Sequence, residues 1–199
     1  LNELPEGVVV ESLARALVDR GDVLESVLGE REDLDKTPFY ELNRAFMVDG
    51  AFVQIPRNVV VEEPLHLVFL TVARERTIAS HPVNIVLAEA GSQIQIVETY
   101  GGLDGEVYLT NAVTEIREEE NAVVDHYKVQ RESSSAFHVA TSSFVQKRNA
   151  TLSNHSLSLG ARLARNDIRA LLDGEGADVT LNGLYVVRGT QHVDHHTVI

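Results

Sequence analysis

The stretch Gly91-Ser92-Gln93-Ile94 decides the fold, because a pattern of the same kind returns three times further along the chain. Each copy has a turn residue, then Ser or Ala, then a variable residue, then a branched apolar residue. The later copies are Asn121-Ala122-Val123-Val124, Asn149-Ala150-Thr151-Leu152 and Gly176-Ala177-Asp178-Val179. They follow at intervals of 30, 28 and 27 residues. Such a period is typical of a solenoid, in which one supersecondary unit stacks on copies of itself.

Alignment of the four copies predicts which residues stack, because successive coils of such a solenoid pair in parallel. One column is entirely apolar and is expected to point inward: Ile94, Val124, Leu152 and Val179. Two residues further, the next column on the same face is Ile96, His126, Asn154 and Leu181. If this register holds, His126 and Asn154 are partly buried and hydrogen-bonded, with each other as one option. A β-bulge that turns both side chains outward is the alternative.

The remaining chain predicts a mainly β protein with a small helical segment at its start. Residues 1–45 have apolar positions at helical spacing, with Ser12 as an N-cap, a break at Gly21 and a stop at Gly29. The expected helix faces are Leu13, Ala16 and Leu17, then Val23, Val27 and Leu28. We assign residues 46–199 to a β-helix core. After Pro82 this core contains no proline, as expected for strands that are paired on both edges.

The amino-acid composition narrows the range of functions that this chain can have. The net charge of −13 argues against nucleic-acid binding, and no apolar run is long enough to cross a bilayer. There is no cysteine, so these residues supply no disulfide, thiolate ligand or cysteine nucleophile. This composition fits a reducing cytoplasm. Both ends of the sequence are expected to be cut, so we interpret it as a fragment of a longer protein.

A histidine-rich run near the end provides the candidate metal ligands, His192, Asp194 and His196. On a strand these three side chains share one face, while His195 points to the other. The three positions span about 13 Å, whereas zinc–ligand bonds are about 2 Å long. One ion therefore cannot collect all three from a straight strand. We interpret the run as a polar strand or interface face and assign no metal site.

Several motifs, taken in order, resemble the SufB/SufD family over most of the chain from about residue 38 onward. They are 46–56 (FMVDGAFVQIP), 58–61 (NVVV), Pro64-Leu65, Arg165-Asn166-Asp167, 181–185 (LNGLY) and 191–197 (QHVDHHT). The resemblance implies a right-handed parallel β-helix and a scaffold subunit of the cytoplasmic SUF machinery for iron–sulfur cluster assembly. It also implies a SufB-type partner and a SufC-type ABC ATPase, which would bind the ATP.

The resemblance also limits what can be assigned. The lack of cysteine favours the SufD-like branch, because SufB-type subunits use cysteine to receive sulfur. The family's functional cysteine/histidine pair and its ATPase-docking helices match nothing up to Ile199. We therefore expect a non-enzymatic role, with no catalytic residue and no cofactor bound by these residues.

Two other functions remain as alternatives, and we also expect this chain to associate with another β coil. A β-helix enzyme acting on polysaccharide would use the cluster Arg162, Arg165, Asp167 and Arg169. A metal-binding β-sandwich or cupin-like barrel would use His192, Asp194 and His196. The last coil is expected to be an open pairing edge, so we predict association of this chain through its C-terminal β edge.

Overall fold

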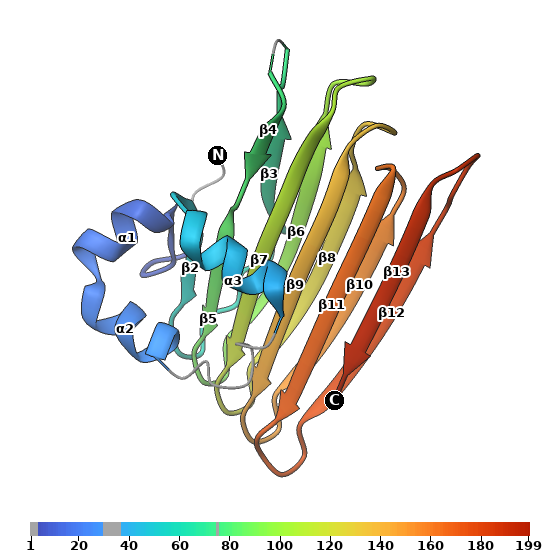
Figure 1. The fold of residues 1–199 in the computed structure, drawn as a ribbon. Coiled ribbons are helices and arrows are strands. Elements are labelled where there is room, and N and C mark those ends of the chain that lie inside the picture. Colours follow the sequence, from blue (N-terminus) through green and yellow to red (C-terminus); the bar gives the residue numbers. More distant parts are fainter. Residues whose placement is uncertain (1–3, 30–36, 75) are drawn as a thin grey trace.

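The computed structural model describes residues 4–29, 37–74 and 76–199. In it the chain forms a β-solenoid of about five turns, built from two sheets (Figure 1). The first sheet has the order β1 (Val9–Ser12), β2 (Gly50–Ile55), β5 (Val83–Ala88), β7 (Tyr108–Glu118), β9 (Phe137–Gln146), β11 (Leu163–Leu172) and β13 (His192–Val198). A short strand, β4 (Ile78–Ser80), also pairs with β7. The second sheet has the order β3 (Leu65–Thr71), β6 (Gln93–Gly102), β8 (Val123–Arg131), β10 (Thr151–Ser158) and β12 (Asp178–Tyr185).

The predicted right-handed parallel β-helix is confirmed. Strand pairs from β2 onward are parallel within each sheet, and only β1 with β2 is antiparallel. In Figure 1 the chain runs down the front sheet and up the sheet behind it while it advances from left to right, and this path is a right-handed coil. The cupin-like barrel is therefore wrong, because parallel coils stack along an axis instead of closing into an antiparallel barrel. β1 was not predicted by the sequence.

Both predicted columns are confirmed by the strand register. Ile94 pairs with Val124, which pairs with Leu152, which pairs with Val179. The three central strands put these apolar side chains into a core between the two sheets, together with Ile116 and Phe144 from the facing sheet. The second column also runs from Ile96 to Leu181 in register.

The turn residue of each repeat has a left-handed backbone, which explains why the pattern begins with Gly or Asn. The stacked positions with positive φ are Asn58, Gly91, Asn121, Asn149 and Gly176. Asn58 is thus a fifth copy that the sequence pattern did not reveal. The Asn149 amide donates to Asn121 Oδ1 at 3.2 Å. At Gly91 a Cβ would lie 2.5 Å from Asn58 Oδ1, so glycine at this position avoids a clash with the asparagine of the preceding coil.

Three helices pack on the outer face of the first sheet: α1 (Leu13–Asp19), α2 (Gly21–Gly29) and α3 (Pro38–Phe46) (Figure 1). The predicted cap is confirmed, since Arg15 N–H donates to Ser12 Oγ at 3.3 Å. The predicted face of α1 is only partly right. Leu13 and Ala16 are buried, but Leu17 is 38% exposed because the sheet contacts a narrower stripe of this short helix. The side chains of Val27 and Leu28 lie outside the described residues.

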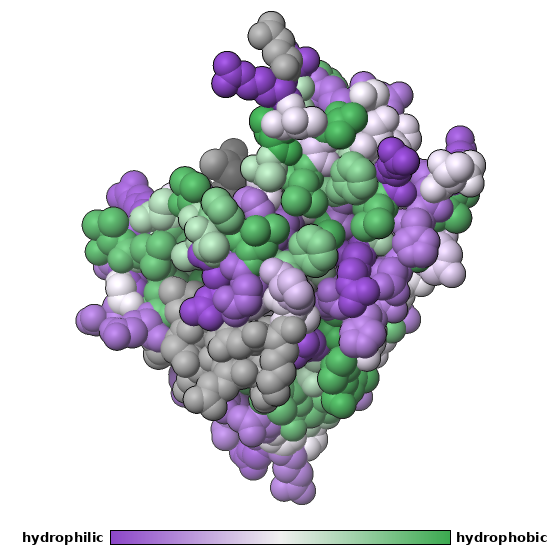
Figure 2. All heavy atoms as spheres, viewed as in Figure 1, coloured by the Kyte–Doolittle hydropathy of each residue, from purple (hydrophilic) through white to green (hydrophobic). Residues whose placement is uncertain are grey.

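A buried asparagine helps to hold α3 on the sheet. Asn43 Nδ2 donates to the backbone carbonyls of Pro82 and Asn111, at 3.1 and 2.7 Å. In return, Asn111 Nδ2 donates to the carbonyl of Phe39 at 2.8 Å. Apolar packing by Leu13, Ala16, Leu24 and Tyr40 against the sheet completes the contact. Figure 2 shows patches of hydrophobic residues among hydrophilic ones on this face of the molecule.

None of the described helices has the length and apolar character needed to cross a bilayer. α3 ends at Phe46 and β2 begins at Gly50.

Candidate functional site in the solenoid interior

The interior of the solenoid is apolar in one half and polar in the other. Along β6 and β8, the inward positions continue beyond the two predicted columns to Glu98 and Lys128, which are register partners. Both side chains are almost fully buried, as are His126 and His138. Buried ionisable groups are rare unless they are paired, so this half of the interior is the candidate functional site.

The first buried pair is Glu98 with His126. Glu98 Oε1 lies 3.3 Å from His126 Nε2, and the carboxylate accepts hydrogen bonds from Tyr100 and Thr114 at 2.9 Å each. Burial by itself would raise the pKa of Glu98. The contact with His126, together with those two hydroxyl donors, outweighs burial and lowers this pKa. Glu98 is therefore an ionised group inside the protein.

The predicted bond between His126 and Asn154 is confirmed, and the bulge alternative is wrong. Asn154 Nδ2 donates to His126 Nδ1 at 2.8 Å, with both side chains fully buried. Ser156 in turn donates to Asn154 Oδ1 at 3.3 Å. His126 thus bridges Glu98 on one side and Asn154 on the other.

Substitution Asn154→Ala is expected to lower the free energy of unfolding by about 2 kcal/mol, because it leaves His126 Nδ1 buried without a donor. The control is Asn182→Ala, which removes an exposed asparagine amide that lies 3.4 Å from His155. Urea unfolding of both variants and of the parent chain measures the two losses in the free energy of unfolding. Equal losses in the two variants would contradict a structural role for the His126–Asn154 bond.

The second buried pair is Glu132 with His138. His138 Nδ1 lies 2.7 Å from Glu132 Oε2, and the carboxylate also accepts from Thr110 at 2.5 Å and Gln130 at 3.0 Å. Burial would raise the pKa of Glu132, but His138 and these donors lower it overall. The pKa of His138 is lowered by burial and by the charge of Lys128, which keeps this ring neutral.

Lys128 lies between the two pairs. Its ammonium donates to Asn166 Oδ1 at 2.5 Å and lies 5.6 Å from the centre of the Tyr100 ring. Burial lowers the pKa of Lys128 to about 8, although Glu98 and Glu132 act in the opposite direction. A lysine with this pKa can exchange its proton near physiological pH, unlike a surface lysine.

The polar row ends in the last coil, at His195. Asn166 Nδ2 donates to His195 Nε2 at 3.0 Å and to Ser158 Oγ at 3.2 Å. As predicted, His195 faces away from His192, Asp194 and His196. Gly183 makes room for it, since a Cβ there would lie 2.9 Å from His195 Nδ1. The Leu181-Asn182-Gly183 motif and the histidine-rich run therefore meet in three dimensions.

The predicted metal candidates are occupied by other contacts or lie apart. Arg165 forms an ion pair with Asp194 and a two-point pair with Asp167, at 2.9 and 2.6 Å. His196 Nδ1 lies 3.5 Å from Asp167 Oδ1, and His192 is exposed. Within residues 4–29, 37–74 and 76–199, no three His, Cys, Asp or Glu side chains are grouped to hold a metal ion. Arg165 and Asp167, proposed for a polysaccharide enzyme, instead bind each other across the outer strand face.

The sequence did not reveal Glu98, Lys128, Glu132 or His138. Extending the two aligned columns by two residues would have found Glu98 and Lys128 as inward positions. Glu132 and His138 lie around the turn between β8 and β9, where column alignment does not reach.

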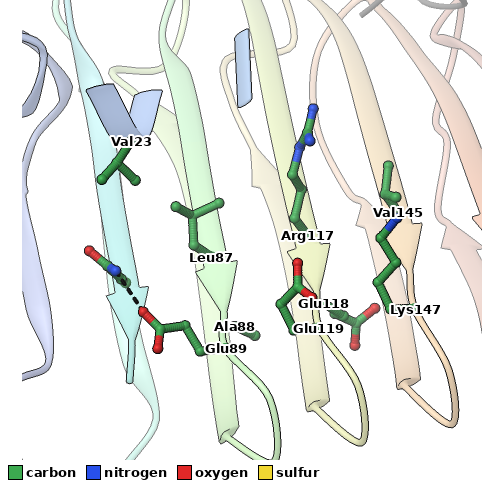
Figure 3. A pocket seen from close by; sticks show the side chains of 10 residues that line it. Val23, Leu87, Ala88, Glu89, Arg117, Glu118, Glu119, Val145 and Lys147 are labelled. Atoms are coloured by element: carbon green, nitrogen blue, oxygen red, sulfur yellow. Dashed lines mark hydrogen bonds between the residues drawn. The ribbon is translucent and has the colours of Figure 1, made fainter. Parts of the chain in front are cut away.

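A pocket of about 330 Å³ lies where β2, β5, β7 and β9 of the first sheet end, beside α2 (Figure 3). It is lined by Val23, Gln54, Leu87, Ala88, Glu89, Arg117, Glu118, Glu119, Val145 and Lys147. Its charges have both signs, and Gln54 donates to Glu89 at 2.7 Å. This lining favours neither an anion nor a cation, so we place the functional site in the interior instead.

Comparisons with known proteins agree with this architecture. Residues 69–199 match the family model described as SUF system FeS cluster assembly, SufBD core domain, and residues 1–67 match the SufBD protein N-terminal region. The chain is 32% identical over 206 residues to an iron-sulfur cluster assembly SufBD family protein of Synechocystis, covering 100% of this chain and 45% of that protein.

Two further relatives are more distant. Protein ABCI7, chloroplastic, of Arabidopsis thaliana is 26% identical, covering 100% of this chain and 42% of that protein. The iron-sulfur cluster assembly protein SufB of Bacillus subtilis is 25% identical, covering 95% of this chain and 40% of that protein. The chain thus spans less than half the length of these curated relatives. Because the two family models together account for nearly every residue, the chain belongs to the SufB/SufD family of iron–sulfur cluster assembly proteins.

Proposed function

We propose that the chain belongs to a non-enzymatic, SufD-like scaffold subunit that acts in the cytoplasm. In this proposal it pairs with a SufB-type subunit and with a SufC-type ATPase, which hydrolyses the ATP. The iron–sulfur cluster is the cargo of the system and is not held by these residues. The observation that carries the SufD-like assignment is the residue content of the interior site. Its ionisable groups are Glu, His, Lys and Tyr, and the sequence has no cysteine to accept sulfur.

The last coil of the described residues is open on one side. Within the described residues, β12 and β13 each pair with a strand on one side only. Leu181 and Val193 of this coil are half-buried, although their counterparts Asn154 and Ala164 in the coil before are buried. A further β coil, from the same protein or from a partner, can pair with the backbone donors and acceptors of this edge.

Co-purification tests the proposal. The complete gene product that contains this chain is tagged and co-expressed with the SufB-type and SufC-type proteins of the same organism. We expect both to be retained, with ATP hydrolysis dependent on the SufC-type protein and no sulfur transferred onto this chain. A folded gene product that retains neither protein would refute the scaffold assignment.

Association through the terminal coil is tested separately with a matched pair of variants, Leu181→Lys and Asn182→Lys. Both add one positive charge to β12, but only Leu181 lies in the inward column. An inward lysine opposes edge pairing. We expect light scattering to show association of the parent chain and of Asn182→Lys, and a monomer for Leu181→Lys. A monomeric parent chain at high concentration would contradict pairing of this chain with itself.

A further inference from the structure

The side chain of Asn166 joins two protonatable groups that lie in different coils. Its Oδ1 accepts from Lys128 Nζ at 2.5 Å, and its Nδ2 donates to His195 Nε2 at 3.0 Å. Asn166 is buried, Lys128 is almost fully buried, and His195 is partly exposed in the terminal coil. One amide therefore contacts both an interior lysine and a histidine of the last described coil.

This arrangement sets the protonation state of both partners. Because Asn166 Oδ1 accepts from Lys128, its Nδ2 is turned toward His195. A nitrogen that accepts a hydrogen bond carries a lone pair, so His195 is neutral and its proton is on Nδ1. Gly183 leaves space for that nitrogen, since a Cβ there would meet it at 2.9 Å.

The surrounding charges oppose simultaneous protonation of the two groups. The pKa of His195 is lowered first by burial and then by the charge of Lys128, while Asp194 acts in the opposite direction. Lys128 faces Glu98 and Tyr100 of β6, Glu132 after β8, His138 of β9 and Asn166 of β11. Both carboxylates contact histidines, Glu98 with His126 and Glu132 with His138, and the hydrogen bond of the ammonium described in this structure goes to Asn166 instead.

We propose that Asn166 is a two-state amide switch that makes protonation of Lys128 and protonation of His195 mutually exclusive. In the state described here, Lys128 is charged and His195 is neutral. Rotation of the amide by half a turn exchanges its two ends. Nδ2 then donates to a neutral Lys128, and Oδ1 accepts from Nε2–H of a charged His195. One proton leaves Nζ and one arrives at Nε2, so the total charge is unchanged.

The Ser158 hydroxyl suits both states. It lies 3.2 Å from His195 Nε2 and 3.2 Å from Asn166 Nδ2, and a hydroxyl can rotate to donate or to accept. The switch relays events at the terminal coil to the interior, because any acidic group brought against His195 favours the second state. This inference does not depend on the proposed function, since it concerns contacts within the chain alone.

The test is nitrogen-15 NMR of the histidine rings and of the lysine Nζ in the purified chain between pH 5.5 and 10. In the parent chain at pH 7, we expect His195 to be neutral with its proton on Nδ1. Substitution Lys128→Met is expected to raise the pKa of His195 by about one unit or more, because a nearby positive charge is removed. A proton on Nε2 of neutral His195, or an unchanged pKa in Lys128→Met, would overturn the switch.

Two further variants distinguish an effect carried by the Asn166 amide from the direct effect of removing the Lys128 charge. Lys147→Met removes a positive charge that pairs with Asp173 at the surface, and it is expected to leave His195 unchanged. In an Asn166→Ala background, Lys128→Met is expected to shift the pKa of His195 by less than half as much. An equal shift with and without the amide would show direct charge repulsion alone and would refute the switch. The tautomer measurement needs no substitution, so the proposal stays testable if a variant fails to fold.

Discussion

Replacing Glu118 with glutamine is expected to raise the free energy of unfolding at pH 8 by about 4 kcal/mol. Glu118 follows Ile116 on the inward side of β7 and is only 1% exposed. Burial raises the pKa of its carboxyl from 4.5 to about 8. Neither carboxylate oxygen has a hydrogen-bond partner among the described residues, and the same holds for Oε1 of its register partner Gln146. A protonated Glu118 can offer a donor at this position, whereas an ionised one cannot.

The sign of the pH dependence follows from this raised pKa. Between pH 4.5 and about 8, the folded chain keeps a proton on Glu118 that the unfolded chain has lost. The contribution of Glu118 to the free energy of unfolding is therefore fully present below pH 4.5 and is lost as the pH rises to about 8. Glutamine is neutral throughout and has its own N–H donors, so Glu118→Gln removes that decline.

Urea unfolding at several pH values between 4.5 and 8 measures the effect. The difference between Glu118→Gln and the parent chain is expected to be near zero at pH 4.5 and largest at pH 8. Glu119→Gln is the matched control, because Glu119 is the next residue and is exposed. If both variants follow the parent chain at every pH, Glu118 is ionised in the folded protein and the expected origin of the effect is wrong.

Substitution Leu152→Ala is expected to lower the free energy of unfolding by about 3 kcal/mol. Leu152 is fully buried and lies between Val124 and Val179 in the inward column. The cavity would be enclosed by coils on both sides, which limits its collapse. Thermal and urea unfolding measure the loss, with Ser153→Ala as the control on the opposite face of β10. A loss below about 1 kcal/mol would mean that this column is loosely packed.

A large part of the fold could be predicted because the sequence pattern that specifies each coil is short and is repeated along the chain. The turn residues need left-handed backbone, and the branched residues three positions later need burial, so every coil carries the same short pattern. Parallel stacking then converts equal positions into neighbours, which is why the Ile94 column and the His126–Asn154 bond were predicted correctly. The position of His195 on the face opposite His192, Asp194 and His196 followed from the alternation of side chains along a strand.

Other features depended on packing that no single segment encodes. Leu17 has the spacing of a buried helix residue, but only contact with the sheet determines how wide the buried stripe of α1 is. Lys128 on β8 and Asn166 on β11 are separated by 38 residues and belong to facing sheets, whereas Asn166 and His195 are register partners in neighbouring coils of one sheet. The contact between Lys128 and Asn166 depends on how far apart the two sheets are and on how each coil is shifted against the next. The spacing of the repeats in the sequence determined which residues of successive coils stack within one sheet. The contacts across the interior were decided only by the tertiary structure, because periodicity relates residues along one sheet and not residues of facing sheets.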